Sequence, residues 1–263
     1  MSKHPLQESL DNLPDYLADA ARLYGIVEQR NATLAAERRA SGNRTGAGSP
    51  PVANKSLNRA VVVASVGALE AFCEDLALRA LPLVGTVAAS TSWFPIEGTG
   101  GMVQTPNSRN IAKMLWAHFH YDPRPDWNIV VSTSWAEVGN GTRWRGTTKN
   151  YQGNDAASAL DTMVKVRHGF AHQDRASAPP SMPGIVELTP TRKLSLQSHH
   201  ALNSMSIVVQ VAVQTTHGLA AHLGQPTGPF RWKQAMGAGG WERLLGDTPA
   251  ATEVQAQWTH HPF

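Results

Sequence analysis

The chain has 263 residues, of which 41% are hydrophobic, so it holds enough apolar material for a folded core of one or two domains. It carries 23 lysines and arginines against 20 acidic residues, and this net charge of +3 is too small for a protein that coats a nucleic-acid duplex through phosphate neutralisation alone. The single cysteine, Cys73, excludes an internal disulfide framework and a cysteine-built zinc ribbon.

The first predicted element is a helix over residues 14–39, in which apolar side chains recur at steps of three and four. Pro14 suits its first turn and Asn12 suits its cap. The first ten residues hold no apolar segment of the signal-peptide kind, so we expect a cytoplasmic protein. Residues 41–51, rich in glycine, serine and proline, predict a linker.

A second, longer helix is predicted from Asn54 or Ser56 to Leu81, ended by Pro82 and Gly85. Four charged residues interrupt its apolar run and argue against a membrane span. Its expected buried face consists of Val61, Ala64, Ala68, Leu69, Phe72 and Leu76. Small residues beside this face allow another helix to approach closely, and Cys73 is expected to be a core residue.

Shorter elements follow in the middle of the chain. A loop is predicted over residues 86–106, a helix over 108–119 and a short strand over 129–131. Asn140 and Gly141 form a turn signal. The segment after this turn is locally basic and contains Arg143, Arg145 and Lys149 beside Trp144 and Tyr151.

Two helices complete the predicted fold, one from Asn154 or Asp155 to His172 and one over residues 195–223. The proline-rich segment 175–192 between them is predicted to be a loop. The tail, residues 225–263, is expected to add a short helix near residues 240–245. Four or five helices with few strands predict an all-α bundle with loop-rich insertions and an extra N-terminal helix.

The segment 160–172 carries the most informative chemistry, because an apolar helix there presents Arg167 and, five residues later, His172. An arginine can bind a phosphate and stabilise the charge of a phosphoryl transition state, and an imidazole can move a proton near neutral pH. Five residues at about 100° each place the two side chains about 140° apart on an ideal helix. They can therefore serve one site if the helix end bends, if the arginine reaches round, or if a second copy contributes.

Three segments together resemble the HEPN family, in particular the RiboL-PSP type of prokaryotic defence and toxin systems. Residues 57–78 resemble its first long helix, residues 106–115 its short helix, and residues 160–172 its motif helix. The family motif is an arginine, a polar residue, three further residues and a histidine. Here a histidine stands at the polar position, where asparagine or aspartate is common, and Gln173 stands where glycine often follows.

The resemblance implies a helical domain over residues 54–224, with residues 1–53 and 225–263 outside it. It also implies a homodimer whose motif residues line one cleft and cleave RNA without metal or cofactor. Arg167 would bind the scissile phosphate, His172 would act as general acid or base, and His168 would assist. The products would be a cyclic phosphate and a 5′-hydroxyl. A toxin or phage-defence effector of this kind would have an antitoxin or another defence protein as partner.

Other polar residues have competing interpretations. Glu70 needs a partner if it is buried, and it would either hold Arg167 or pair with Arg59 or Arg79. The basic residues Arg143, Arg145 and Lys149 would either bind single-stranded RNA together with aromatic rings or form an ordinary basic loop. The remaining candidate metal ligands are predicted to be solvated helix histidines, since no carboxylate or thiolate stands at ligand spacing: His199, His200, His217 and His222.

Three functions follow from these patterns. The first is a metal-independent HEPN-type endoribonuclease. The second is a non-catalytic dimeric module that binds RNA or a protein partner through the same residues. The third is a metal-dependent hydrolase that uses the additional histidines, and its sensitivity to EDTA would distinguish it from the first.

Overall fold

The computed structural model describes residues 4–41, 52–85, 105–138, 143–172, 179–188 and 194–226, and the helical positions Trp241, Leu245, Ala250, Ala251 and Val254. This part of the chain is mostly helical, with two antiparallel sheets of two strands each. The prediction of an all-α fold is therefore confirmed. None of the helices in the described ranges has the length and apolar character that a membrane crossing requires.

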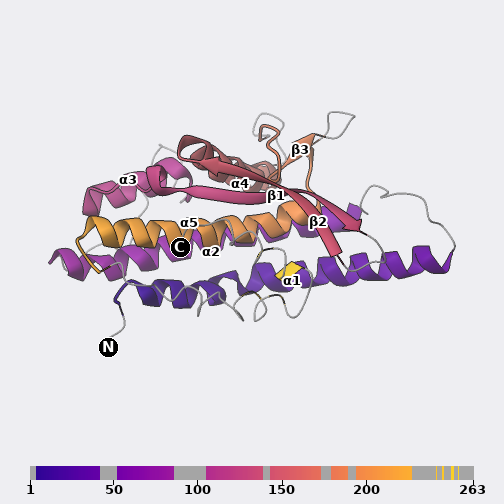
Figure 1. The fold of residues 1–263 in the computed structure, drawn as a ribbon, viewed down its shortest axis with the longest axis horizontal. Coiled ribbons are helices and arrows are strands. Elements are labelled where there is room, and N and C mark those ends of the chain that lie inside the picture. The colour runs from indigo at the N-terminus through magenta and orange to yellow at the C-terminus, as the bar shows by residue number, and fades with distance from the viewer. Residues whose placement is uncertain are drawn as a thin grey trace.

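Three long helices form the body of the molecule and lie alongside one another (Figure 1). They are α1 (Gln7–Ala40), α2 (Val52–Ala80) and α5 (Ser198–His222). Helix α2 packs against both α1 and α5, and these two helices also contact each other. All three helices were expected from the sequence, and the predicted apolar face of α2 is buried apart from Ala64, which is half-buried.

Helix α1 begins seven residues before its predicted start, so Asn12 is not a cap and Pro14 lies inside the helix. The three leucines that precede this proline, Leu6, Leu10 and Leu13, are all buried. Each buried leucine contributes about 1.5–3 kcal/mol, whereas a proline inside a helix costs about 3 kcal/mol. The apolar burial therefore outweighs the missing backbone hydrogen bond.

Helix α2 ends close to where it was predicted to end. A single turn of 3-10 helix, η1 (Leu81–Val84), follows it, and Gly85 closes that turn with a positive φ of 72°. The next helix, α3 (Ser108–Phe119), has the predicted bounds. It begins with a cap in which the Asn107 side chain accepts a hydrogen bond from the backbone of Asn110.

Helix α4 (Asn154–His172) contains the motif segment and also matches its predicted range. Asp161 on this helix binds the first residue of α3. Its two carboxylate oxygens accept hydrogen bonds from the backbone N–H and the hydroxyl of Ser108, at 2.7 and 2.9 Å. This contact fixes α3 against the helix that carries Arg167.

A β-hairpin lies across α5 on the side away from α1 (Figure 1). The predicted strand at 129–131 is part of the longer β1 (Asn128–Val138), which follows the short 3-10 helix η2 (Arg124–Asp126). The basic stretch, which carried no strand prediction, is β2 (Arg143–Gln152), paired antiparallel to β1. The predicted turn at Asn140 and Gly141 lies outside the described residues.

Three carboxamide side chains of α5 hydrogen-bond the backbone of alternate residues of β1. Each accepts a hydrogen bond from the N–H and donates one to the C=O of the same strand residue, at 2.5–3.3 Å. The pairs are Asn203 with Ser132, Gln210 with Val130, and Gln214 with Asn128. Helix α5 therefore takes the place of a third strand at this edge of the hairpin.

A second, smaller sheet joins β3 (Glu187–Leu188) to β4 (Leu194–Ser195), just before α5. Strand β3 falls in the segment that was predicted to be entirely loop. In the tail, Trp241 and Leu245 are helical and buried, in agreement with the short helix predicted there. Both belong to the same connected core as α1, α2 and α5.

Candidate functional site

The motif arginine is paired with a glutamate of the neighbouring long helix. Arg167 Nη1 lies 3.4 Å from Glu70 Oε2, and the two side chains are 26% and 20% exposed. This contact joins α4 to the middle of α2. Of the partners considered for Glu70, the structure therefore places Arg167 beside it, while Arg79 binds Asp75 and Glu8 at the end of α2.

Burial and the charge of Arg167 act on the pKa of the Glu70 carboxyl in opposite directions. Burial raises the pKa of the Glu70 carboxyl, the Arg167 guanidinium opposes that rise, and the neighbouring Glu74 adds to it. A guanidinium has five N–H donors, and the contact with Glu70 engages Nη1. The partly exposed arginine is thus anchored at one nitrogen and still has donors that a phosphate could use.

The other two motif residues, His168 and His172, lie on the last turn and a half of α4. Their backbone is helical, and their side chains lie outside the described part of the structure. Because α4 continues to His172, the angular offset of about 140° from Arg167 applies within one chain.

The predicted RNA-binding residues Arg143, Arg145 and Lys149 are on β2. They are separated by even numbers of residues, so strand alternation places them on one face of β2. The side chains of the two arginines lie outside the described residues, and Lys149 is exposed. The basic residues therefore form a row along a strand and not a basic loop.

Tyr151 does not fit the aromatic role considered for it. Its ring is buried, its hydroxyl donates a hydrogen bond of 2.8 Å to the carbonyl of Pro183, and burial raises its pKa to about 12. Lys149 Nζ lies 5.9 Å from the centre of this ring. A ring enclosed in this way is not available to stack on a base, so Tyr151 belongs to the core.

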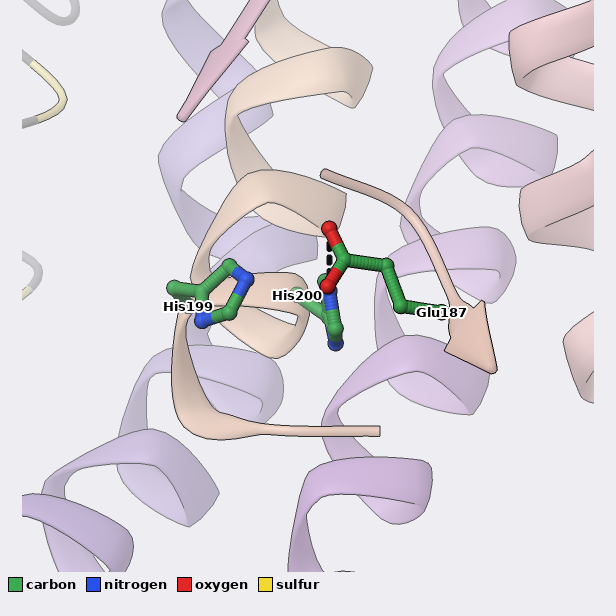
Figure 2. Close-up of side chains that lie close together, drawn as sticks. All are labelled: Glu187, His199 and His200. Atoms are coloured by element: carbon green, nitrogen blue, oxygen red, sulfur yellow. Dashed lines mark ion pairs between the residues drawn. The ribbon is translucent and has the colours of Figure 1, made fainter. Parts of the chain in front are cut away.

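Two histidines that were predicted to be solvated are buried instead. His199 and His200 are 6% and 1% exposed, and their ring centroids are 3.9 Å apart. Figure 2 shows both rings at the start of α5 facing Glu187 from β3, with His200 Nε2 3.8 Å from Glu187 Oε1. The prediction was wrong because it treated the histidines as isolated on a helix and found no carboxylate near them in sequence.

Hydrogen bonds to the backbone hold the segments that carry Glu187, His199 and His200 in place. Asn203 donates hydrogen bonds to the carbonyls of Ser132 and Gly184, which ties the turn before β3 to β1. The backbone N–H of Gly184 then donates to Glu187 Oε1 at 3.3 Å. His200 Nδ1 accepts a hydrogen bond from the backbone N–H of Gln197 at 2.9 Å, as half of a capping box at the start of α5.

The charges in the cluster follow from burial and proximity. Burial, reinforced by the neighbouring His200, lowers the pKa of His199 to about 3, so this ring is neutral at pH 7. The His200 imidazole lowers the pKa of Glu187, whose side chain is 35% exposed and ionised at pH 7. The cluster thus combines a neutral imidazole with a carboxylate that is open to solvent on one side.

The other two histidines considered as metal ligands lie further along α5, away from this cluster. His217 is half-buried, and burial lowers its pKa. His222 is exposed, as predicted, and its Nε2 is 2.9 Å from the carbonyl oxygen of Phe119.

Comparison with known proteins adds no further assignment. No protein-family model matches this chain, and no curated protein or solved structure does so either.

Proposed function

We propose that this protein is a metal-independent endoribonuclease of the HEPN type, acting as a homodimer and serving as a toxin or defence effector. The observation that supports it most directly is the Arg167–Glu70 pair, which anchors the motif arginine between α4 and α2 and leaves it partly exposed. An arginine held in this way is suited to binding a phosphate that approaches from solvent.

In this proposal, Arg167 binds the scissile phosphate and stabilises the negative charge of the transition state. His172 takes the proton of the ribose 2′-hydroxyl or gives one to the leaving 5′-oxygen. The 2′-oxygen forms a bond to phosphorus while the bond to the 5′-oxygen breaks, which yields a cyclic phosphate and a 5′-hydroxyl. His168 is assigned as the polar residue that assists.

The helical geometry of α4 supports the proposal of a homodimer. Because the helix continues through His172, five residues of ideal helix separate the two motif positions by about 140° within one chain. A second copy of α4 across a two-fold axis would bring the arginine of one chain toward the histidine of the other. The row of Arg143, Arg145 and Lys149 on β2 is proposed to hold the flanking RNA.

The test compares purified wild-type protein with Arg167→Ala and His172→Ala on single-stranded RNA in the presence of EDTA. Each substitution is expected to reduce cleavage by about a hundredfold or more, because each removes an electrostatic or proton-transfer contribution. Arg22→Ala, which removes an exposed arginine that pairs with Asp19, and His120→Asn are matched controls that should cleave normally. RNA methylated at the 2′-oxygen should resist the wild-type protein.

Full cleavage by both motif variants would contradict the assignment. RNA binding that weakens in these variants, with no cleavage by the wild-type protein, would instead favour the non-catalytic binding module. Size-exclusion chromatography with light scattering checks that the variants keep the oligomeric state of the wild type.

A further inference from the structure

We propose that Glu187, His199 and His200 form a binding site for one divalent transition-metal ion of the zinc class. The site would join β3 to the first turn of α5, and it is separate from the RNA-cleaving residues on α4. The ion is bound at this site and takes no part in the proposed cleavage, which remains independent of metal.

The geometry supports a three-ligand site. Each of the three residues offers one ligand atom, and these atoms all lie within 4.8 Å of one another. Ligands around a tetrahedral zinc ion, with bonds of about 2.0–2.1 Å, are about 3.4 Å apart, so binding requires a contraction of up to about 1.4 Å. Glu187 is the residue that can make this movement, because its side chain is partly exposed whereas both rings are buried (Figure 2).

The donor atoms select the class of metal. Two imidazoles with one carboxylate are a ligand set that zinc uses in proteins when a fourth position is left to water. Magnesium and calcium prefer oxygen ligands only, so a site with two nitrogen donors discriminates against them. The exposed side of Glu187 gives an ion and its water a route from solvent.

Binding through His200 has one identifiable cost. Its Nδ1 accepts the hydrogen bond from Gln197 and so carries no proton, which places the ring N–H on Nε2, the nitrogen that faces Glu187. A metal at Nε2 moves that proton to Nδ1 and removes the hydrogen bond from Gln197. A metal–imidazole bond outweighs one neutral hydrogen bond, and the Gln197 side chain still accepts its own capping hydrogen bond.

This cost gives the proposal a specific signature. Metal binding should shift the backbone amide resonance of Gln197, because that N–H loses its acceptor. It should also move the proton of the His200 ring from Nε2 to Nδ1. A zinc ion held only at the protein surface would change neither signal.

The experiment uses the full chain without an affinity tag, treated with EDTA and then desalted. Calorimetric titration with zinc chloride should give one site per chain with a Kd of about 1 µM or tighter. Glu187→Gln and the double variant His199→Gln/His200→Gln should each weaken that site at least about tenfold. His120→Asn is the matched control, because His120 is exposed and its positive φ of 55° suits asparagine, and it should bind zinc like the wild type.

His172→Ala separates this proposal from the proposed function, because it should abolish RNA cleavage and leave zinc binding unchanged. Circular dichroism checks that each variant is folded. If the double variant does not fold, the shift of the Gln197 amide signal when zinc is added to the wild-type protein provides the second measurement. Unchanged zinc affinity in Glu187→Gln, or the absence of a one-to-one site in the wild-type protein, would overturn the assignment.

Discussion

Glu28 on α1 is an acidic residue with a strongly displaced titration, since burial raises the pKa of its carboxyl to about 7. An unfolded chain ionises the same carboxyl near pH 4.5. The folded state therefore holds this proton more tightly than the unfolded state does. The resulting contribution to stability is fully present below pH 4.5 and is lost as the pH rises through 7.

Glu28→Gln should remove this pH dependence. At pH 8 the variant is expected to be more stable than the wild type by about 1–2 kcal/mol, a value that allows for solvent screening. At pH 4 the two proteins should have nearly equal stability. Urea unfolding of both proteins at pH 4, 6 and 8 measures the difference, and a difference that does not change with pH would contradict the prediction.

The burial or the partner of a residue could be predicted from the sequence where both contacting residues lie on long helices. Cys73 is buried as expected, and Glu70 contacts Arg167, one of its proposed partners. The burial of His199 and His200 was not predictable in the same way, because Glu187 reaches them from a strand of two residues within a proline-rich segment. Such a short strand has no periodic pattern that would reveal which side chains face α5.

The contact between α5 and β1 can be tested by changing one of its carboxamides, Gln210, and measuring the stability of the protein. Gln210 is fully buried, and it donates to the carbonyl of Val130 and to the Ser206 hydroxyl while accepting from the N–H of Val130. Gln210→Glu keeps the shape but replaces the donor group with a carboxylate, which only accepts. We expect a loss of about 2–4 kcal/mol at pH 7.

This loss should shrink at acid pH relative to the wild type. Burial would keep the pKa of the introduced carboxyl above its unfolded value, and the protonated acid can donate again, so the variant loses stability as the pH rises. Gln152→Glu, at an exposed position of β2, is the control and should change stability little. Equal stability losses for Gln210→Glu at pH 4 and pH 7 would contradict this account.

Helices were predictable here because their signals are local. Proline and glycine end α2, an asparagine caps α3, and apolar side chains recur through both. The hairpin was only partly predictable, because β2 is rich in polar and charged residues and pairs with a strand whose other edge is satisfied by side chains. Hydrogen bonds between carboxamides and a strand more than seventy residues away leave no pattern in either segment alone.

The packing of the described helices includes α1, although the proposed HEPN-type domain begins only after it. The buried leucines Leu6, Leu10, Leu13 and Leu17 belong to the same core as α2 and α5. Asn12 also donates a hydrogen bond to Asp75, and Asn54 donates one to Asn31, which connects α1 to α2 at two levels. The first helix is therefore part of the central packing.

A chain that begins at residue 52 should lose cooperative unfolding. Four buried leucines alone contribute about 6–12 kcal/mol, which is comparable to the total stability of a typical domain. Thermal unfolding followed by circular dichroism is the measurement, with a chain that begins at His4 as control. A truncated chain that melts sharply at the wild-type temperature would show that α1 is dispensable.

The carboxamide contacts of α5 also limit how this hairpin can associate with other polypeptides. An unpaired strand edge invites an additional strand from another molecule and is a common origin of aggregation. Along β1, from Asn128 to Ser132, that edge is occupied by six hydrogen bonds with side chains of α5, three donated by the strand and three by the helix. An invading strand therefore cannot pair with the backbone of β1 at this edge between Asn128 and Ser132 unless it displaces α5.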